Sequence, residues 1–309
     1  MPYHPIAPRF DLFQGCEIPG AGFGYVALQD IPKGTILLED TPIFRLPEGI
    51  TNEVVRNHLI RLPPTVQQQF MDLCIGYQYL NDGEYLGRFR ANALPCGYDN
   101  VDGTGRKLAG LLLLAARFNH SCVPNVTFKW DSQAGVMRFC ALSAISRAQE
   151  LCIAYDVSSL LFTRDARRAR LQGSSGFLCH CPACIIENRD SDDRRVALYK
   201  AIVQPPQRSP RETQIEFLSR RYAQICTALT LLRMEGLSHF RETLYFDGYK
   251  LCEEAGDRNN AMLWLAQASA AAATVGGPHN AEVTRRLQRA NAELEAPNQR
   301  PQILRFPLP

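Results

Sequence analysis

Residues 179–184 read CHCPAC, which places three cysteines within six positions of the chain. Such short spacings let one tight turn present several thiolates to a tetrahedral zinc ion, which needs four ligands in a closed structural site. Three cysteines are one ligand short, and His180 sits between two of them, where it is a poor fourth ligand. Either the cluster is three unrelated thiols, or the fold must bring a distant segment back to this turn.

The stretch RFNHSCVPN, residues 117–125, holds the candidate for the fourth ligand. Cys122 lies there in a polar loop, although a lone cysteine is more often a small core residue. His120 and Cys122 would share one face of a strand, yet catalytic Cys–His pairs usually come from distant sequence positions. A cysteine-protease site is therefore disfavoured, and His120 stays open as either a cofactor contact or a hydrogen-bonded loop residue.

The cysteine count favours a reducing, intracellular location. The chain has eleven cysteines, an odd number, and its start, MPYHPIAPRFDLFQG, lacks the basic-then-apolar pattern of a secretory signal. We expect cytoplasm, nucleus or both. The cysteines outside the two motifs are expected to be small buried hydrophobes; they are Cys16, Cys74, Cys96, Cys140, Cys152, Cys226 and Cys252.

Composition sets the class of partner. Hydrophobic residues make up 46% of the 309 positions, enough for a core, and the net charge of +3 is too small to argue for nucleic acid. The longest apolar run, LAGLLLLAA at 108–116, is far shorter than the roughly 20 residues of a membrane span. It predicts a buried helix over 106–118, and neither nucleic acid nor membrane is expected as a partner.

The glycine-rich stretch GAGFG, residues 20–24, frees the backbone for tight turns and for close approach to a ligand. It does not have the spacing of a dinucleotide-binding loop, and the lysine of a P-loop is missing. Taken alone, it is equally consistent with the entrance to a hairpin.

The first 190 residues combine strand signals with a helical insert. Two pairs of predicted strands are each joined by a turn: GYVAL and TILLED by DIPKGT, and NVTFKWD and VMRFCAL by SQAG. ELCIAYD predicts a further short strand. Residues 51–80 instead predict two short helices broken at Pro63 and Pro64, with Thr51 as the first N-cap.

A polar, proline-punctuated segment near residue 190 predicts a boundary, and the rest of the chain is expected to be helical with an irregular tail, PNQRPQILRFPLP. Apolar residues recur there at steps of three and four, which is typical of amphipathic helices. They are Ile215, Leu218, Tyr222, Ile225, Leu229 and Leu232, and later Val283, Leu287, Ala290 and Leu294.

Four motifs occur in an order that resembles a SET-domain protein. They are GAGFG with its strand pair, RFNHSCVPN, ELCIAYD and FLCHCPAC. The type is one related to the SET-and-MYND group and common in fungi. The resemblance implies an α+β fold of short β-sheets with a pseudoknot, a zinc-bound post-SET segment and a helical C-terminal domain. It places the SET domain at 1–190, with its insert at about 51–80 and its cysteine cluster at about 177–186, and the helical domain at 191–309. The MYND finger is expected to be absent, because Cys74 and Cys96 are too few for its two zinc ions.

SET proteins mostly transfer a methyl group from S-adenosylmethionine to a lysine amine, so the resemblance implies this cofactor, Zn²⁺ and a protein or peptide substrate. Tyr155 matches the catalytic tyrosine. The residues that match the cofactor site are Ala21, Gly22, Phe23, Asn119, His120, Tyr155 and Phe177. The residues that match the zinc ligands are Cys122, Cys179, Cys181 and Cys184.

The chain departs from the family before the tyrosine strand. Where the family has Gly-Glu-Glu-Leu, the sequence is AQEL, so that Ala148 and Gln149 replace a glycine and a glutamate while Glu150 and Leu151 remain. This departure keeps two further hypotheses open. One is a SET scaffold used on a small molecule in fungal secondary metabolism, by methyl transfer or cofactor-assisted cyclisation, since fold does not fix function. The other is a non-catalytic interaction module.

Overall fold

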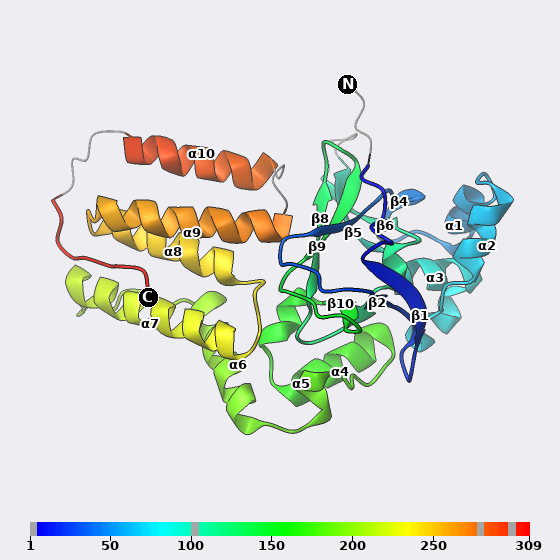
Figure 1. Cartoon of the computed structure of the whole chain (residues 1–309), viewed down its shortest axis with the longest axis horizontal. Helices are drawn as coiled ribbons and strands as arrows, with labels where there is room; N and C mark the ends of the chain where they lie inside the picture. Colours follow the sequence, from blue (N-terminus) through cyan, green and yellow to red (C-terminus); the bar gives the residue numbers. More distant parts are fainter. Residues whose placement is uncertain (1–4, 100–104, 277–280, 296–300) are drawn as a thin grey trace. The chain divides into compact units, whose positions relative to one another are not determined.

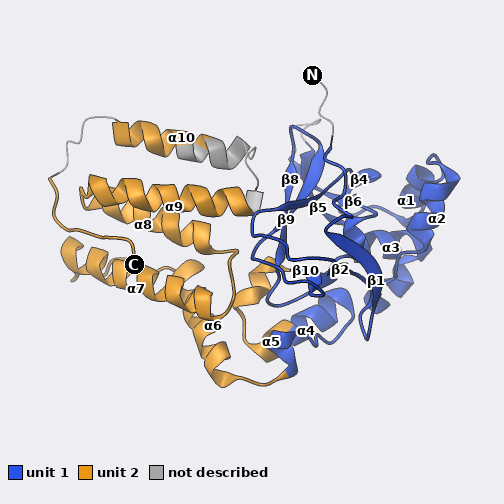
Figure 2. Ribbon diagram, viewed as in Figure 1, with its two compact units in different colours: residues 1–155, 168–185 blue, residues 156–167, 186–309 orange. Residues whose placement is uncertain are grey.

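The computed structural model describes residues 5–99, 105–276, 281–295 and 301–309. Packing divides the chain into two compact units, which Figure 2 shows in different colours. One unit contains residues 1–155 and 168–185, and the other contains residues 156–167 and 186–309. These are units of packing, and the domain boundary expected near residue 190 stays a prediction.

Three small sheets build the first unit (Figure 1). The four-stranded sheet has the order β1 (Phe13–Ile18), β2 (Gly22–Ala27), β10 (Glu150–Ile153), β7 (Asn119–His120). The second has the order β3 (Ile36–Asp40), β9 (Val136–Ala141), β8 (Val126–Asp131), and the third β4 (Phe44–Pro47), β6 (Arg106–Leu111), β5 (Leu94–Asp99). The short strand β10 runs antiparallel to β2 and parallel to β7. It therefore lies between the glycine-rich stretch and residues Asn119–His120 of RFNHSCVPN.

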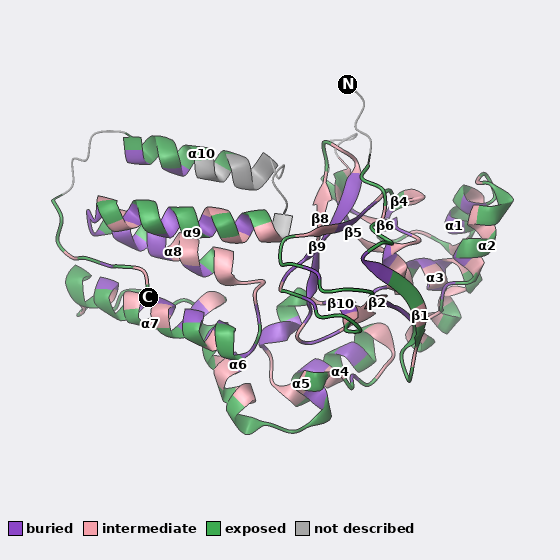
Figure 3. Ribbon diagram, in the orientation of Figure 1, coloured by how far each residue is buried: buried purple, intermediate pink, exposed green. Residues whose placement is uncertain are grey.

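The core of this unit lies beneath β9, all six of whose residues are buried (Figure 3). Phe118 stacks on Phe139 of β9 with ring centroids 5.1 Å apart, and Tyr25 meets the edge of Phe118 at 4.9 Å. The residue next to Phe118 is Asn119, so packing of this ring fixes the backbone from which the polar motif begins.

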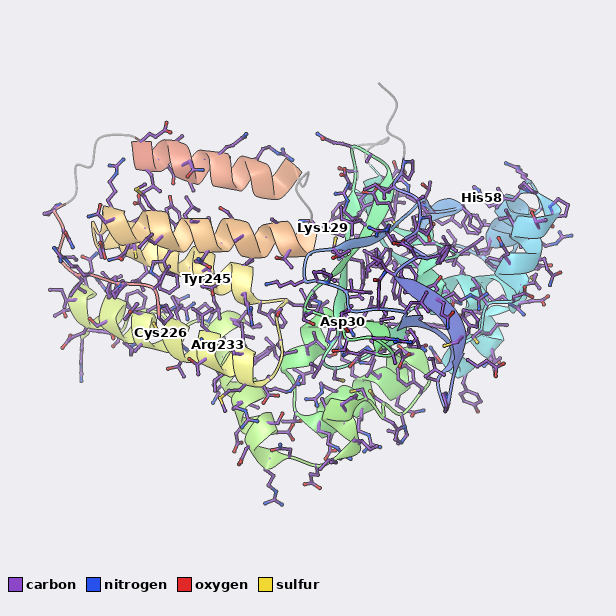
Figure 4. The ribbon with its side chains drawn as sticks, viewed as in Figure 1. Asp30, His58, Lys129, Cys226, Arg233 and Tyr245 are labelled. Atoms are coloured by element: carbon purple, nitrogen blue, oxygen red, sulfur yellow. The ribbon has the colours of Figure 1, made fainter. Side chains whose placement is uncertain are left out.

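Residues 51–80 contain the two short helices that the prolines predict, α1 (Asn52–Leu59) and α2 (Pro64–Met71). The 3₁₀ helix η1 (Tyr77–Asp82) begins at the end of this insert, and α3 (Glu84–Asn92) follows beyond its predicted bounds. Thr51 is confirmed as the N-cap of α1, because its side chain accepts a hydrogen bond from Val54 N. His58 of α1, labelled in Figure 4, lies 5.9 Å from the ring of Phe44, which also stacks on Phe89 of α3.

The helix predicted over 106–118 is wrong. Residues 106–111 form β6, the central strand of its sheet, and the short 3₁₀ helix η2 (Ala115–Arg117) follows after a turn. A strand that is covered on both faces has a continuous apolar run, which periodicity cannot distinguish from a buried helix. Gly110 lets β6 lie close to β5, because a Cβ at this position would lie 2.4 Å from Cys96 Sγ.

The second unit is helical, as predicted. Its elements are η3 (Val157–Leu161), the first turn of α4 (Arg164–Ser175), α6 (Arg189–Ile202), α7 (Gln214–Met234), α8 (Arg241–Glu254), α9 (Arg258–Gly276) and α10 (Ala281–Glu295). The expected stripe on α7 is buried at Leu218, Ile225, Leu229 and Leu232, whereas Ile215 is exposed. On α10, Ala290 and Leu294 are buried, and the side chains of Val283 and Leu287 lie outside the described residues.

Residues 301–309 are irregular, as predicted, but they are held against the helices of the second unit. Phe306 is buried, its carbonyl oxygen accepts from Trp264 Nε1 at 2.7 Å, and its backbone N donates to Asp257 Oδ2 at 2.7 Å. The tail therefore completes the hydrogen bonding of a buried indole and a buried carboxylate. In the described part of the chain no helix is long and apolar enough to cross a membrane.

All eleven cysteines lie within the described residues, and none of them forms a disulfide. Outside the two motifs, Cys96, Cys140, Cys152 and Cys252 are buried, as expected for small hydrophobes. The same expectation is wrong for Cys74, which is exposed.

The turn over residues 146–149, before β10, contains the AQEL departure. Ala148 has φ of 66°, the only positive φ among the described residues other than glycine. Its N donates to Ala27 O at 2.8 Å, and Gln149 Oε1 accepts from Ser146 N at 3.0 Å. The departure therefore changes a turn, where alanine replaces the residue that adopts this conformation without strain.

We expect Ala148→Gly to raise the free energy of unfolding by about 1 kcal/mol, because it relieves the left-handed alanine. Chemical denaturation measures the change. Ala166→Gly, on the exposed face of α4, is the control and should lower stability by about 1 kcal/mol, since glycine is a poorer helix former. A loss of stability in both variants would contradict the strained turn.

Candidate functional site

Four cysteines from two distant segments converge in the first unit. The sulfur atoms of Cys122, Cys179, Cys181 and Cys184 all lie within 4.8 Å of one another. Cys122 follows β7, while the other three surround the start of α5 (Pro182–Ile185), where Cys184 N donates to Cys181 O at 2.8 Å. This turn presents the thiols, and Cys122 N donates to Cys181 Sγ at 3.3 Å, which closes the group across 59 residues of sequence.

The chemistry of this group suits a soft divalent metal ion. Three of the thiols are buried and the fourth is half-buried. Hydrogen bonds from Cys122 and then Cys179 lower the pKa of Cys184 to about 7 and also lower that of Cys181, whereas the hydrogen bonds of Cys122 to the other three cysteines raise its own pKa. Four clustered cysteine sulfur atoms are a common ligand set of structural zinc. His180 is exposed and is not a member of the group.

The structure brings the glycine-rich stretch against Asn119. Asn119 Nδ2 donates to Glu150 Oε1 at 2.9 Å, and this pair lies against Gly24 of β2. A Cβ on Gly24 would approach Asn119 Nδ2 to 2.6 Å and Glu150 Oε1 to 3.0 Å. Gly24 is thus the glycine whose missing side chain lets the two segments meet, whereas Gly22 has φ of 77° and open space around it.

Phe23 points to the other side of β2. Its ring lies over Gly15 of β1, where a Cβ would come within 2.4 Å of it, and the Arg117 guanidinium sits 5.4 Å from the ring centroid. The arginine of RFNHSCVPN therefore reaches the glycine-rich stretch through a cation–π contact. Phe23 remains 45% exposed, so much of the ring surface is open to a ligand.

Three aromatic rings gather at the end of β10. The ring centroid of His120 lies 5.3 Å from that of Tyr155 and 6.1 Å from that of Phe177. The rings of Tyr155 and Phe177 meet edge to face, with centroids 6.1 Å apart. His120 Nδ1 accepts from Tyr155 N at 3.1 Å, and His120 Nε2 lies 3.3 Å from Cys122 Sγ. One imidazole thus contacts both the tyrosine and the cysteine group.

The hydroxyl of Tyr155 is held by the backbone. It donates to Phe118 O at 3.1 Å, and burial raises its pKa above the usual tyrosine range, with further contributions from Cys152 and Glu150. The residue as a whole is 41% exposed, so part of it is open to solvent. A neutral hydroxyl, fixed in direction, is available at this point of the surface.

The helical insert supports the segment that carries Phe177. Gln78 Nε2 and Tyr79 OH of η1 both donate to Ser174 O, at 2.9 and 3.2 Å. Gly176 follows with φ of 75°, and a Cβ there would meet Gln78 Oε1 at 2.3 Å. The insert therefore fixes the path of the chain from α4 to Phe177.

The structure thus gathers the residues expected for the tyrosine, cofactor and metal sites in one unit. Sequence reasoning missed the importance of Gly24, Glu150 and the insert residues Gln78 and Tyr79. Two of these had a signal, because Gly24 is the third glycine of GAGFG and Glu150 is the carboxylate retained in AQEL. The contacts of η1 with Ser174 join positions about 95 residues apart and leave no local pattern.

The short sheets and the loop that links β7 to the cysteine group define a recognised class of domain. Residues 22–156 match the family model described as the SET domain, so the chain contains a SET domain. The α+β fold expected from the motifs is confirmed.

The chain is also similar to proteins that are named as lysine methyltransferases. The chain is 25% identical over 267 residues to "Histone-lysine N-methyltransferase set5" of Schizosaccharomyces pombe, a match that covers 82% of this chain and 76% of the relative. It is 33% identical over 130 residues to "Protein-lysine N-trimethyltransferase SMYD5" of Danio rerio, covering 42% of this chain and 28% of the relative. A third relative, "Histone-lysine N-methyltransferase SET5" of Vanderwaltozyma polyspora, is 37% identical over 109 residues, covering 35% of this chain and 19% of the relative.

Metal analysis of the purified chain should find about one zinc ion per molecule, because four converging thiols form one closed site. Cys122→Ser should lose the zinc and also weaken cofactor binding, since Cys122 lies three residues after Asn119 of β7. Cys226→Ser, which changes a half-buried thiol of α7 outside the group, is the control and should keep both. Clearly less than one zinc per chain in the native protein would contradict the site.

We expect Gly24→Ala to weaken S-adenosylmethionine binding by at least tenfold, because the new methyl group displaces Asn119 or Glu150. Calorimetric titration with the cofactor measures the change. Gly173→Ala is the control, since a Cβ in that part of α4 meets no atom within 4 Å. Equal affinities in the two variants would show that the Gly24 contact is not needed.

Proposed function

We propose that this chain transfers a methyl group from S-adenosylmethionine to a lysine amine of a protein or peptide. The observation that carries the proposal is Tyr155, whose hydroxyl is fixed on Phe118 O beside the rings of His120 and Phe177. The SET domain at residues 22–156 and the relatives named as lysine methyltransferases support the same activity.

The donor groups around Asn119 fit the cofactor. The glycine-rich backbone near Gly22, free of side chains, suits close approach of a ligand, and the Asn119 amide suits its amino-acid and adenine portions. We assign cofactor binding to Ala21, Gly22, Phe23, Asn119, His120, Tyr155 and Phe177. When bound, S-adenosylmethionine supplies an electrophilic methyl group on a sulfonium.

The protein's part in this chemistry is mainly positioning. The Tyr155 hydroxyl donates its proton to Phe118 O, so its oxygen can accept a hydrogen bond from the substrate amine. This bond would orient the lone pair of the amine nitrogen toward the methyl group. A tyrosine hydroxyl is already neutral near pH 7, and burial raises the pKa of Tyr155 further, so the group acts through hydrogen bonds and not as a base. The two oxygens also favour positive charge that develops near the amine.

Zinc would be structural in this account. All four ligand positions are taken by Cys122, Cys179, Cys181 and Cys184, which leaves no open position for a substrate. Its role would be to fix the segment that carries Phe177 beside β7. We also expect an intracellular protein, because none of the eleven cysteines forms a disulfide.

The test is transfer of labelled methyl from S-adenosylmethionine to histones and to a broad panel of lysine peptides. Tyr155→Phe removes only the hydroxyl and should lower kcat by at least a hundredfold while leaving cofactor affinity within about threefold. Tyr98→Phe, which changes an exposed tyrosine of β5, is the control and should retain full activity. Intact cofactor binding with no transfer to any lysine substrate would contradict the proposal.

A further inference from the structure

His120 makes two contacts with one imidazole ring, and the contacts lead to different sites. Nδ1 is 3.1 Å from the backbone N of Tyr155, and Nε2 is 3.3 Å from the Sγ of Cys122. The first partner is the residue assigned to the reaction, and the second is a member of the cysteine group. The ring is half-buried, and its centroid is 5.3 Å from that of Tyr155.

The contact with Tyr155 fixes the protonation of the ring. A backbone N–H can only donate, so Nδ1 must present a lone pair. The imidazole is therefore neutral and carries its hydrogen on Nε2, which is the nitrogen that faces Cys122 Sγ. That sulfur then accepts a hydrogen bond from His120, as thiolate ligands of a metal commonly do from neighbouring groups.

Tyr155 is consequently bonded at both ends to the short segment 118–120. Its backbone N donates to His120, and its hydroxyl donates to Phe118 O. A shift of β7 relative to Cys122 would therefore move the hydroxyl and the backbone of Tyr155 together.

We propose that His120 is a positioning residue whose imidazole couples the cysteine group to Tyr155, holding the tyrosine backbone through Nδ1 and the metal-facing thiolate through Nε2. The inference rests on the proposed function for its effect on catalysis, whereas the two contacts stand on geometry alone. The side chain of His120 thus has a role besides contact with the cofactor.

Two substitutions separate the two contacts. His120→Asn places an acceptor near the position of Nδ1 and has nothing at Nε2, while His120→Gln places an N–H donor near the position of Nε2 and lacks the acceptor at Nδ1. His180→Asn is the control, because this exposed histidine lies between two cysteines of the group without belonging to it.

The contact between His120 Nε2 and Cys122 Sγ can be tested without measuring enzyme activity. In the cobalt-substituted full-length chain, His120→Asn should move the thiolate-to-cobalt absorption band to longer wavelength and weaken zinc binding by roughly 10- to 100-fold. A sulfur that loses a hydrogen bond becomes a stronger electron donor, which is the cause of the shift. His120→Gln and His180→Asn should keep the wild-type spectrum. An unchanged spectrum in His120→Asn would overturn the Cys122 contact.

The contact between His120 Nδ1 and the backbone N of Tyr155 is tested by nitrogen NMR and by kinetics. Chain labelled with ¹⁵N-histidine should show His120 with an unprotonated Nδ1 and a protonated Nε2; the opposite tautomer would overturn the proposal. His120→Gln should lower kcat by roughly tenfold or more while changing the KM for the lysine substrate little, and His120→Asn should recover part of kcat. If wild-type chain transfers no methyl group, the proposed function fails, while the spectrum and the tautomer still decide the two contacts.

Discussion

A single buried asparagine, Asn125, fixes the segment 117–125 against strand β10, and the rest of the site depends on this contact. Asn125 Nδ2 donates to Glu150 O and its Oδ1 accepts from Cys152 N, both at 2.8 Å, and its own carbonyl accepts from Leu142 N at 2.7 Å. The last residue of RFNHSCVPN is thus bonded to the backbone of β10, a strand of four residues that also pairs with β2 and β7. Because a buried amide left without these partners would cost about 1–3 kcal/mol, the alternative paths of the chain are disfavoured.

The position of β10 determines the geometry on both of its sides. Glu150, at its start, reaches Asn119 against Gly24, and Tyr155, just past its end, reaches back to Phe118 and His120. Between them Ser121 N donates to Ile153 O at 3.0 Å, which extends the pairing of β7 toward Cys122. Residues 118–122 therefore contact the core, Glu150, the tyrosine and the cysteine group in succession.

Much of the site was predictable because its chemistry is concentrated in short motifs. CHCPAC and RFNHSCVPN each hold their residues within nine positions, so residue type and spacing indicated three cysteines with Cys122 as a candidate fourth. The order of the motifs indicated a likeness to a SET domain, which the family match confirms, and that likeness implied the asparagine–histidine pair and the full set of four cysteines. The roles of the individual residues stay predictions. What could not be predicted depends on tertiary contacts: β6 was taken for a helix because both its faces are buried, and α3 is capped by Asn52, whose Oδ1 accepts from Tyr85 and Leu86 more than 30 positions away.

Hydrogen exchange of this chain before and after zinc removal tests most directly whether the cysteine group and the tyrosine site are one connected structure. We expect amides in residues 119–123 and 150–155 to lose protection together with those in 179–185, while the β8–β9 hairpin keeps its protection. Loss of protection confined to residues 179–185, with 119–123 and 150–155 unchanged, would contradict it.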